Sequence, residues 1–295
     1  VLRAFFAVST VCLILMCGIL VTEFLLLSDP GQRLQWPYGD PVPGSYLAKF
    51  GLPTIVWLAA LCAKRESSSK AILIISLAIF TVIFITALTG ERANTLILLC
   101  SISLLFFVSK TPLKKKVAAL LLGLTSLTAI FIVQPVIFKR FYELSVVSLT
   151  SAEHGYVKTV NAGVEVWKFN KILGSGPATH RVLCPSLVGE TKFTRCDNHP
   201  HNFYIQILAE VGVVGLIAGV IMFLSIIIHA FNNSRINRNV TFLQNSWVIP
   251  IAFFWPIAGF ADFFGQWQNI FIWGGLSICF ISFKPEPIRE KKFVS

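Results

Sequence analysis

The sequence predicts an all-α protein, a polytopic bundle of transmembrane helices, and three observations lead to this fold class. Hydrophobic residues make up 55% of the chain and charged residues 13%, with a mean hydropathy of +0.73. Soluble domains do not need so much apolar surface. Apolar runs long enough to cross a bilayer recur along the chain. Basic residues gather in every second connection between those runs, as they do in cytoplasmic loops.

Eight apolar runs are the candidate spans, and they cover about residues 4–27, 46–63, 71–88, 93–109, 116–138, 203–230, 242–264 and 267–283. The first run is too long for the apolar core of a signal peptide and lacks a small-residue cleavage site after it, so we count it as a span. The chain begins at Val1 rather than Met, and we expect further helices before it. One membrane domain over residues 1–295 is the simplest organisation.

The charged connections orient these spans. The short connections after the second, fourth, sixth and eighth runs carry Lys64, Arg65, Lys70, Lys110, Lys114, Lys115, Lys116, Arg235, Arg238, Lys284, Arg289, Lys291 and Lys292. The positive-inside rule places these ends in the cytoplasm. The net charge of +11 follows mostly from this topology. No nucleic-acid partner is expected, because the basic residues are divided among separate loops instead of forming one footprint.

The connection 139–202 then faces outward as one large loop between spans five and six, and its length indicates a functional role. Residues 153–171 within it predict an amphipathic helix, because Val157, Val160, Val164 and Trp167 recur at helical spacing. Packing on the membrane surface would explain such a helix. The run Gly174-Ser175-Gly176-Pro177 breaks it. Backbone amides of these glycines could cradle a phosphate, although a lone Gly-x-Gly is weak evidence.

A dense polar cluster ends the loop directly before the sixth span. His199 and His201 bracket Pro200, and Asn202 follows. Since proline blocks a helix before it, the helix should begin about where the apolar run begins. Imidazoles held at a membrane surface suit proton transfer to a substrate delivered from the lipid.

Cys184 and Cys196 lie in the outer loop, whereas the other cysteines lie in spans. An oxidising compartment favours a disulfide between the two, which would stabilise the fold by roughly 3 kcal/mol. A zinc site built from these cysteines with His199 and His201 is the alternative. The spacing fits no common zinc pattern, so we expect a disulfide and no metal.

Outward cations form the second candidate group. Arg92 follows Gly90-Glu91 between two spans, where it either anchors the turn by pairing with Glu91 or binds an anion through its bidentate guanidinium. Arg140, Arg181 and Arg195 make the outer face basic against the topology rule, which favours an anionic ligand.

The sixth span adds two further features. Glu210 lies about two turns into it, where it would pair with a cation or bond to a substrate when protonated. Gly212, Gly215 and Gly219 recur at helical spacing, which is typical of close helix packing.

His201-Asn202, followed after nine residues by Gly212-Val213-Val214-Gly215-Leu216, resembles the signature of the O-antigen ligase family, whose fold the O-antigen polymerases share. Thr89 to Ala93 is similar to the segment that holds the family's arginine at the outer end of a helix pair. The Gly-Ser-Gly-Pro run lies at the matching distance before the histidine motif, and Phe263 to Leu276 resembles the last helix pair. The resemblance covers the chain from about residue 70.

The resemblance implies an integral glycosyltransferase of the bacterial inner membrane, with about twelve helices, of which this chain would lack the first four. Such enzymes move a glycan from an undecaprenyl diphosphate carrier to a hydroxyl of lipid A–core or of another glycan, on the periplasmic side. They use no metal, cofactor or nucleotide sugar. Membrane lipids surround them.

The resemblance also assigns roles to single residues. Arg92 matches the arginine that holds the diphosphate, and His201 matches the histidine proposed as the catalytic base. We expect further substrate contacts from Asn202, Arg181, Arg140, His199 and Glu210. A second family arginine has no counterpart in residues 154–168, where only His154 or Lys158 could replace it.

Ligase and polymerase differ in their acceptor, and the sequence does not separate them. A transporter of polyisoprenyl-linked glycans is the rival from another class, and a non-catalytic scaffold is the third possibility. A transporter would place charges or broken helices near the midplane. The polar residues here gather at one outer edge, and a scaffold would not need the His-Asn cluster, so we favour an enzyme.

Overall fold

The computed structural model describes residues 2–26, 33–39, 42–64, 69–108, 151, 154–236, 245–256 and 262–280, with scattered residues between 117 and 142. These residues are helical and include no strand, which confirms the predicted all-α class. The elements in chain order are α1 (Leu2–Leu26), α2 (Pro43–Lys64), α3 (Ser69–Leu88), α4 (Arg92–Val108), α7 (Gly155–Phe169), α8 (His180–Leu183), the π-helix η1 (Cys184–Val188), α9 (Phe203–Ile236), α10 (Val248–Phe253), α11 (Gln266–Ser277) and the 3-10 helix η3 (Ile278–Phe280).

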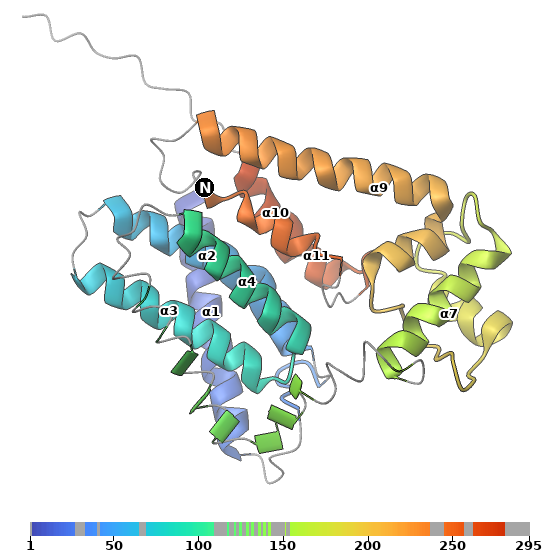
Figure 1. The fold of residues 1–295 in the computed structure, drawn as a ribbon, viewed down its shortest axis with the longest axis horizontal. Helices are drawn as coiled ribbons and strands as arrows, with labels where there is room; N and C mark the ends of the chain where they lie inside the picture. Colours follow the sequence, from blue (N-terminus) through green and yellow to red (C-terminus); the bar gives the residue numbers. More distant parts are fainter. Residues whose placement is uncertain are drawn as a thin grey trace, which may run out of the picture.

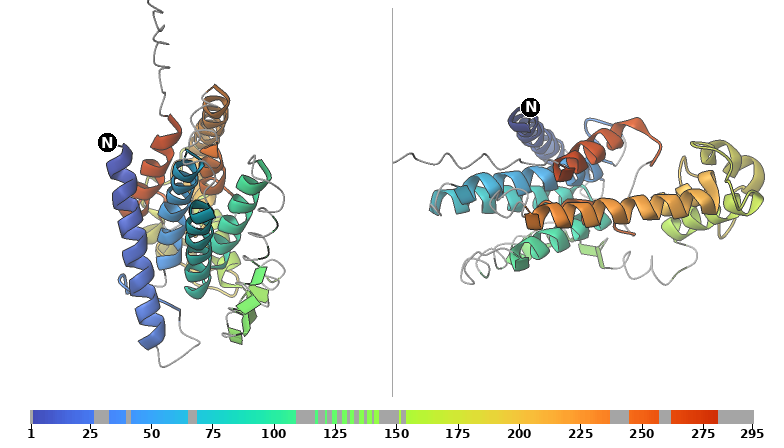
Figure 2. Two further views of the ribbon diagram at one scale, coloured as in Figure 1. Left: turned by 90° about the vertical axis from the view of Figure 1, so that its left-hand side faces the viewer. Right: turned by 90° about the horizontal axis from the view of Figure 1, so that it is seen from above.

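Helix α2 lies at the centre of the bundle, where it contacts α1, α3, α4 and α11. Large apolar side chains fill the space between these helices; Phe6 of α1, for example, stacks on Trp57 of α2 with 4.4 Å between ring centroids. The long helix α9 runs beside α10, and α7 lies against its first turns, away from the four N-terminal helices (Figure 1). Two further views show that α7 and its loop cover one end of α9 (Figure 2).

Two helices among the described residues are long and apolar enough to cross a membrane, Phe6–Leu26 and Phe203–Ile236. Ser76–Leu88 and Arg92–Val108 are shorter apolar helices. Helix α9 leaves a stripe of apolar side chains exposed, as expected of a lipid-facing surface; it consists of Ile217, Ile221, Leu224 and Ile228. The structure thus supports a membrane protein with two candidate spans, and the other six expected spans stay predictions.

The last two expected spans differ most from what the structure describes. Within the run 242–264, the helix α10 covers only Val248–Phe253, and the N–H of Phe254 closes it on the carbonyl of Pro250. Within the run 267–283, α11 covers Gln266–Ser277 before the chain tightens into η3. Most of the fifth run, 116–138, lies outside the described residues.

The topology predicts that the connections near 28–45, 88–92 and 264–267 face outward with 139–202, and these connections meet at one end of the bundle. There Ser45 of α2 accepts a 3.0 Å hydrogen bond from Gln268 of α11, and Asn202 donates to the carbonyl of Pro256. At the opposite end of the bundle, Asn233 near the end of α9 donates to the carbonyl of Cys279 in η3 at 2.9 Å. Which end faces the periplasm stays a prediction.

Helix α9 breaks at Gly212, whose φ of 72° and ψ of −171° are not helical. The loop 171–176 fills the break, so the backbone groups that a broken helix would leave unpaired are bonded. The bonds are Val213 N–H to Lys171 C=O (3.0 Å), Val214 N–H to Ile172 C=O (3.3 Å), Ser175 N–H to Ala209 C=O (3.2 Å) and Gly176 N–H to Glu210 C=O (2.8 Å). Figure 1 shows the resulting bend beside α7.

Gly212 and Gly174 allow the loop to approach the backbone of α9 this closely. A Cβ on Gly212 would collide with the carbonyl of Ile172, and a Cβ on Gly174 would collide with the backbone of Glu210. Both glycines also have positive φ, which side-chain-bearing residues rarely adopt. The packing role expected for Gly212 is therefore corrected, since this glycine serves a helix break instead of a smooth helix surface.

We predict that Gly212→Ala destabilises the protein by about 2 kcal/mol or more, because it adds both strain and a collision. Gly219→Ala is the matched control on the same helix, since its Cβ would meet Ile207 at an ordinary 3.6 Å. That control should be neutral or stabilising by up to about 1 kcal/mol. Thermal unfolding in detergent measures both, and equal unfolding midpoints would contradict the role given to the break.

Candidate active site

The chain turns sharply just before α9 and presents His201 there. His201 has a φ of 55°, a left-handed conformation that is uncommon without glycine and that concentrates at functional sites. Asn202 then caps the helix, because its Oδ1 accepts the N–H groups of Tyr204 at 3.0 Å and Ile205 at 3.3 Å. Helix α9 starts at Phe203, directly after the polar cluster, as Pro200 leads us to expect.

His201 is paired with a carboxylate that the sequence analysis missed. Its Nε2 lies 3.1 Å from Oδ2 of Asp197, while Oδ1 of Asp197 accepts the Nε–H of Arg195 at 3.0 Å. The His201 side chain is 44% exposed and that of Asp197 is 22% exposed. An accessible imidazole oriented by an acid is the arrangement that general bases use. The only sequence signal was an acid four residues before the histidine.

His199 belongs to the same cluster. Its ring meets that of His201 edge to face, with 4.4 Å between centroids. The structure therefore brings both predicted histidines and Asp197 together at the start of α9.

Asn202 fastens three segments to one another. Besides capping α9, it donates to the carbonyl of Pro256 at 2.9 Å and to the hydroxyl of Tyr156 at 3.2 Å. These bonds join α9 to the turn after α10 and to α7. The Asn202 amide thus fixes the segments around His201 relative to one another. A direct contact of Asn202 with substrate stays a prediction.

Cys184 and Cys196 form the disulfide that the sequence analysis expects, with 5.5 Å between Cα atoms. Cys184 is completely buried, and Cys196 directly precedes Asp197. The bridge therefore anchors the segment that carries the partner of His201. Among the described residues, no group of three or more His, Cys, Asp or Glu side chains could hold a metal ion.

Helix α7 forms over Gly155–Phe169, but its buried face is not the valine stripe. The buried residues are Thr159, Ala162, Gly163 and Val166. Gly163 explains the choice, because a Cβ there would meet Ile205 and Pro200 at 2.6 and 2.9 Å. A face of small residues allows α7 to pack closely on the start of α9. The helix α7 thereby supports the turn that carries His201.

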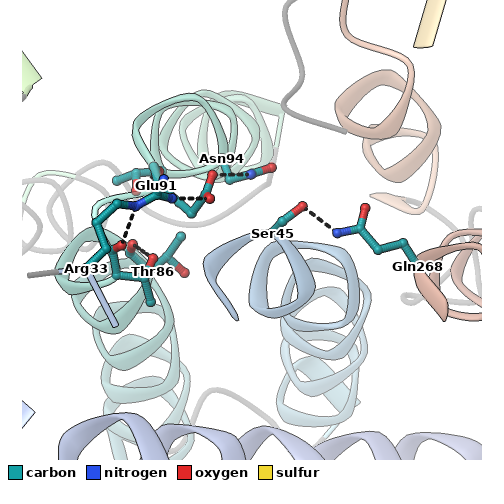
Figure 3. A network of polar contacts seen from close by, with 8 residues as sticks. Arg33, Ser45, Thr86, Glu91, Asn94 and Gln268 are labelled. Carbon is teal, nitrogen blue, oxygen red and sulfur yellow. Dashed lines mark hydrogen bonds and ion pairs between the residues drawn. The ribbon is translucent and has the colours of Figure 1, made fainter. Parts of the chain in front are cut away.

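Arg92 starts α4 at the same end of the bundle. Its neighbour Glu91 is bonded by Nη2 of Arg33 at 2.5 Å and by Nδ2 of Asn94 at 3.1 Å (Figure 3). Glu91 is thus paired with Arg33, a partner that the sequence analysis did not consider. Burial, and then the charge of Arg92, hold the pKa of His154 below its usual value. This electrostatic contact places Arg92 near His154, which caps the start of α7.

Lys49 is a buried cation that sequence reasoning overlooked inside an apolar run. The side chain, in a residue only 2% exposed, lies 3.3 Å from Oδ1 of Asn94 and above the Phe253 ring. A charge inside a membrane bundle usually marks function. Together with Arg33 and Arg92 it concentrates positive charge around Glu91.

Glu210, an expected substrate contact, is bonded within the protein, and a contact with substrate stays a prediction. It is 1% exposed, and its oxygens accept the backbone N–H groups of His180 at 2.9 Å and Ala178 at 2.8 Å. Gln206 also donates to it, at 3.4 Å, and to Asp262 at 2.5 Å. Through these bonds its carboxylate fastens the segment 178–180 to α9. The buried position argues for a structural role.

The loop 171–176, the glycine loop, does not offer a phosphate cradle. The N–H groups of Gly174, Ser175 and Gly176 donate to the carbonyls of Asn170, Ala209 and Glu210. The phosphate-binding interpretation of this run is therefore corrected. Arg181 lies exposed on α8, and Arg140 lies outside the described residues.

Comparison with known proteins supports one family. A family model described as O-antigen ligase matches residues 77–220, a range that contains Arg92, His201 and the break at Gly212. Neither curated proteins nor solved structures give a match. The match confirms the resemblance found in the sequence and indicates a membrane glycosyltransferase of the O-antigen ligase and polymerase type, which acts on lipid-linked glycans and glycan acceptors. Residues 77–220 of this chain are thus similar to the O-antigen ligase family.

Proposed function

We propose that this protein transfers a glycan from an undecaprenyl diphosphate carrier to an acceptor hydroxyl at the periplasmic face of the inner membrane, as an O-antigen ligase. The pairing of His201 with Asp197 at 3.1 Å carries the proposal, because it joins a base and its orienting acid at the end of a helix able to cross a membrane. Arg92, at the same end, supports it by supplying a cation for a diphosphate.

In the proposed reaction His201 takes the proton of the acceptor hydroxyl. The acceptor oxygen bonds to the anomeric carbon of the donor sugar while the bond from that carbon to the diphosphate oxygen breaks. The bonding electron pair leaves with the lipid-linked diphosphate. Asp197 stabilises the imidazolium that forms, as acids do beside catalytic histidines.

Arg92 stabilises the negative charge of the leaving diphosphate. A guanidinium matches two phosphate oxygens at once, and fixed charge aimed at the developing anion lowers the barrier. Glu91 next to it would repel a phosphate, but Arg33 and Asn94 bind that carboxylate. The buried ammonium of Lys49 adds positive charge on the inner side of the same group.

An apolar groove of about 260 Å³ supports a lipid-linked substrate. It runs along α9 and α10 and is lined by Tyr204, Val220, Phe223, Leu224, Ile227, Ile251, Phe254, Trp255 and Pro256. Pro256 at its rim is also bonded to Asn202, so the groove begins beside the histidine cluster. A hydrocarbon chain in the groove would therefore carry its polar head next to His201.

Glycan profiling of a deletion strain tests the proposed activity. Loss of a ligase leaves polymer on the carrier and bare lipid A–core. Single repeats attached to the core would instead indicate the polymerase of the same fold. Unchanged lipopolysaccharide and unchanged carrier-linked glycans would reject both activities.

We predict that His201→Ala lowers the transfer rate by about 10²–10⁴-fold, the usual contribution of a positioned base. Asp197→Asn should also slow transfer, because it keeps the shape but removes the charge that stabilises the imidazolium. His199→Ala should lose much less, since its ring meets that of His201 edge to face and His201 carries the carboxylate partner. Initial rates with purified donor and acceptor measure all three. A greater loss in His199→Ala than in His201→Ala would move the base to His199.

We also predict that Arg92→Ala abolishes transfer at a normal protein level, and that Arg92→Lys recovers only part of it. A lysine supplies the charge without the bidentate fork. Arg235→Ala is the matched control, because Arg235 lies over the Phe231 ring at the far end of α9 and should not affect transfer. Full activity in Arg92→Ala would leave the arginine as a membrane anchor.

A further inference from the structure

His180 is a completely buried imidazole with no assigned role. Among the described residues, neither Nδ1 nor Nε2 has a hydrogen-bond partner, although the backbone N–H of the same residue donates to Glu210. A buried polar atom without a partner costs about 1–3 kcal/mol, and an apolar ring would fill the same place without that cost. The imidazole therefore calls for a reason beyond packing.

The fold brings the segment that carries this ring close to Asp197. Helix α8 continues into η1, and the N–H of Cys184 donates to the carbonyl of His180, so the two residues lie one turn apart on the same face. Cys184 is bridged to Cys196 with 5.5 Å between Cα atoms. Asp197 is the next residue. The disulfide thus brings the buried imidazole and the partner of His201 into the same small region.

The charges around His180 agree with this position. Burial lowers its pKa to about 4, and His201 acts in the same direction, while Asp197 and Asp262 oppose the shift. Asp197 and His201 exert their charges from the segment before α9, and Asp262 from the segment after α10. Glu210 approaches from α9, but backbone N–H groups occupy its oxygens. The ring is neutral near pH 7, so it offers one N–H donor and one acceptor nitrogen.

We propose that His180 is a positioning residue for the proposed transfer: as the acceptor binds, its ring N–H donates to Asp197 and holds that carboxylate against His201. Catalytic hydrogen bonds often tighten only in the substrate complex. Asp197 now receives its second bond from Arg195, whose side chain is 57% exposed and therefore holds the carboxylate weakly. A buried donor would restrict it more, and a neutral one would not compete with the imidazolium of His201.

The inference rests on the proposed function, and a reconstituted assay with purified lipid-linked donor and acceptor tests it. His180→Phe should lower kcat by about 10–100-fold with little change in either KM. Its unfolding midpoint should stay equal or rise, because an apolar ring replaces unpaired polar atoms. His180→Asn keeps a donor and should recover most of kcat. His229→Phe is the matched control, since that ring stacks on Phe280 near the opposite end of α9.

A second measurement identifies the route through Asp197. If His180 acts through that carboxylate, His180→Phe should cause no further loss of kcat in an Asp197→Asn background. His180→Leu serves in the same way if the phenylalanine variant does not fold. Wild-type kcat in the apolar variants, additive losses in the double variant, or unfolding of both apolar variants while His180→Asn folds would each overturn the inference. An inactive wild type in the same assay would instead reject the proposed function.

Discussion

The seating of the glycine loop in the break of α9 is the contact on which the candidate site depends. A break in a helix leaves N–H and C=O groups unpaired, and unpaired groups are costly wherever water is scarce. Residues 171–176 bond to these groups from both sides of Gly212, and Glu210 closes the arrangement by accepting the amides of Ala178 and His180. The same contacts fix the direction of α9 from Phe203 to the break, and with it the turn that presents His201. Without them residues 171–176 would lose their fixed position against α9.

A second set of contacts builds outward from this base. Gly163 allows α7 to approach Pro200 and Ile205, and the disulfide joins the start of η1 to the residue before Asp197. Asn202 then links α7, α9 and the turn after α10. Around Arg92, the Arg33–Glu91 pair and the Lys49–Asn94 bond fix the start of α4. The candidate base and the candidate phosphate-binding arginine are therefore held by two separate networks at the same end of the molecule.

The sequence predicts much of this, and the failures have physical causes. Composition determines the helical membrane class, Pro200 predicts where α9 begins, and the two loop cysteines predict their bridge. The pattern does not predict the break at Gly212, because a glycine at helical spacing can either pack a helix or break one. Only the φ angle of Gly212 separates these two roles. The sequence does not single out Lys49, because one cation hardly changes the apolar character of a run. Its partner Asn94 also lies on another helix. The disulfide and the α8 turn bring the segments of Asp197 and His180 into one region, which no local pattern encodes.

The satisfied backbone at Gly212 has a consequence for how a lipid substrate would travel. Because the loop supplies the missing hydrogen bonds, the broken part of α9 does not need water, and it can lie at the edge of the hydrocarbon layer. Under the proposed function, His201 would then lie close to the depth of the phosphate headgroups. Under the proposed function, the carrier reaches the base by lateral diffusion within its leaflet. No methylene of its tail has to be extracted into water, a step that would add about 0.8 kcal/mol for each one.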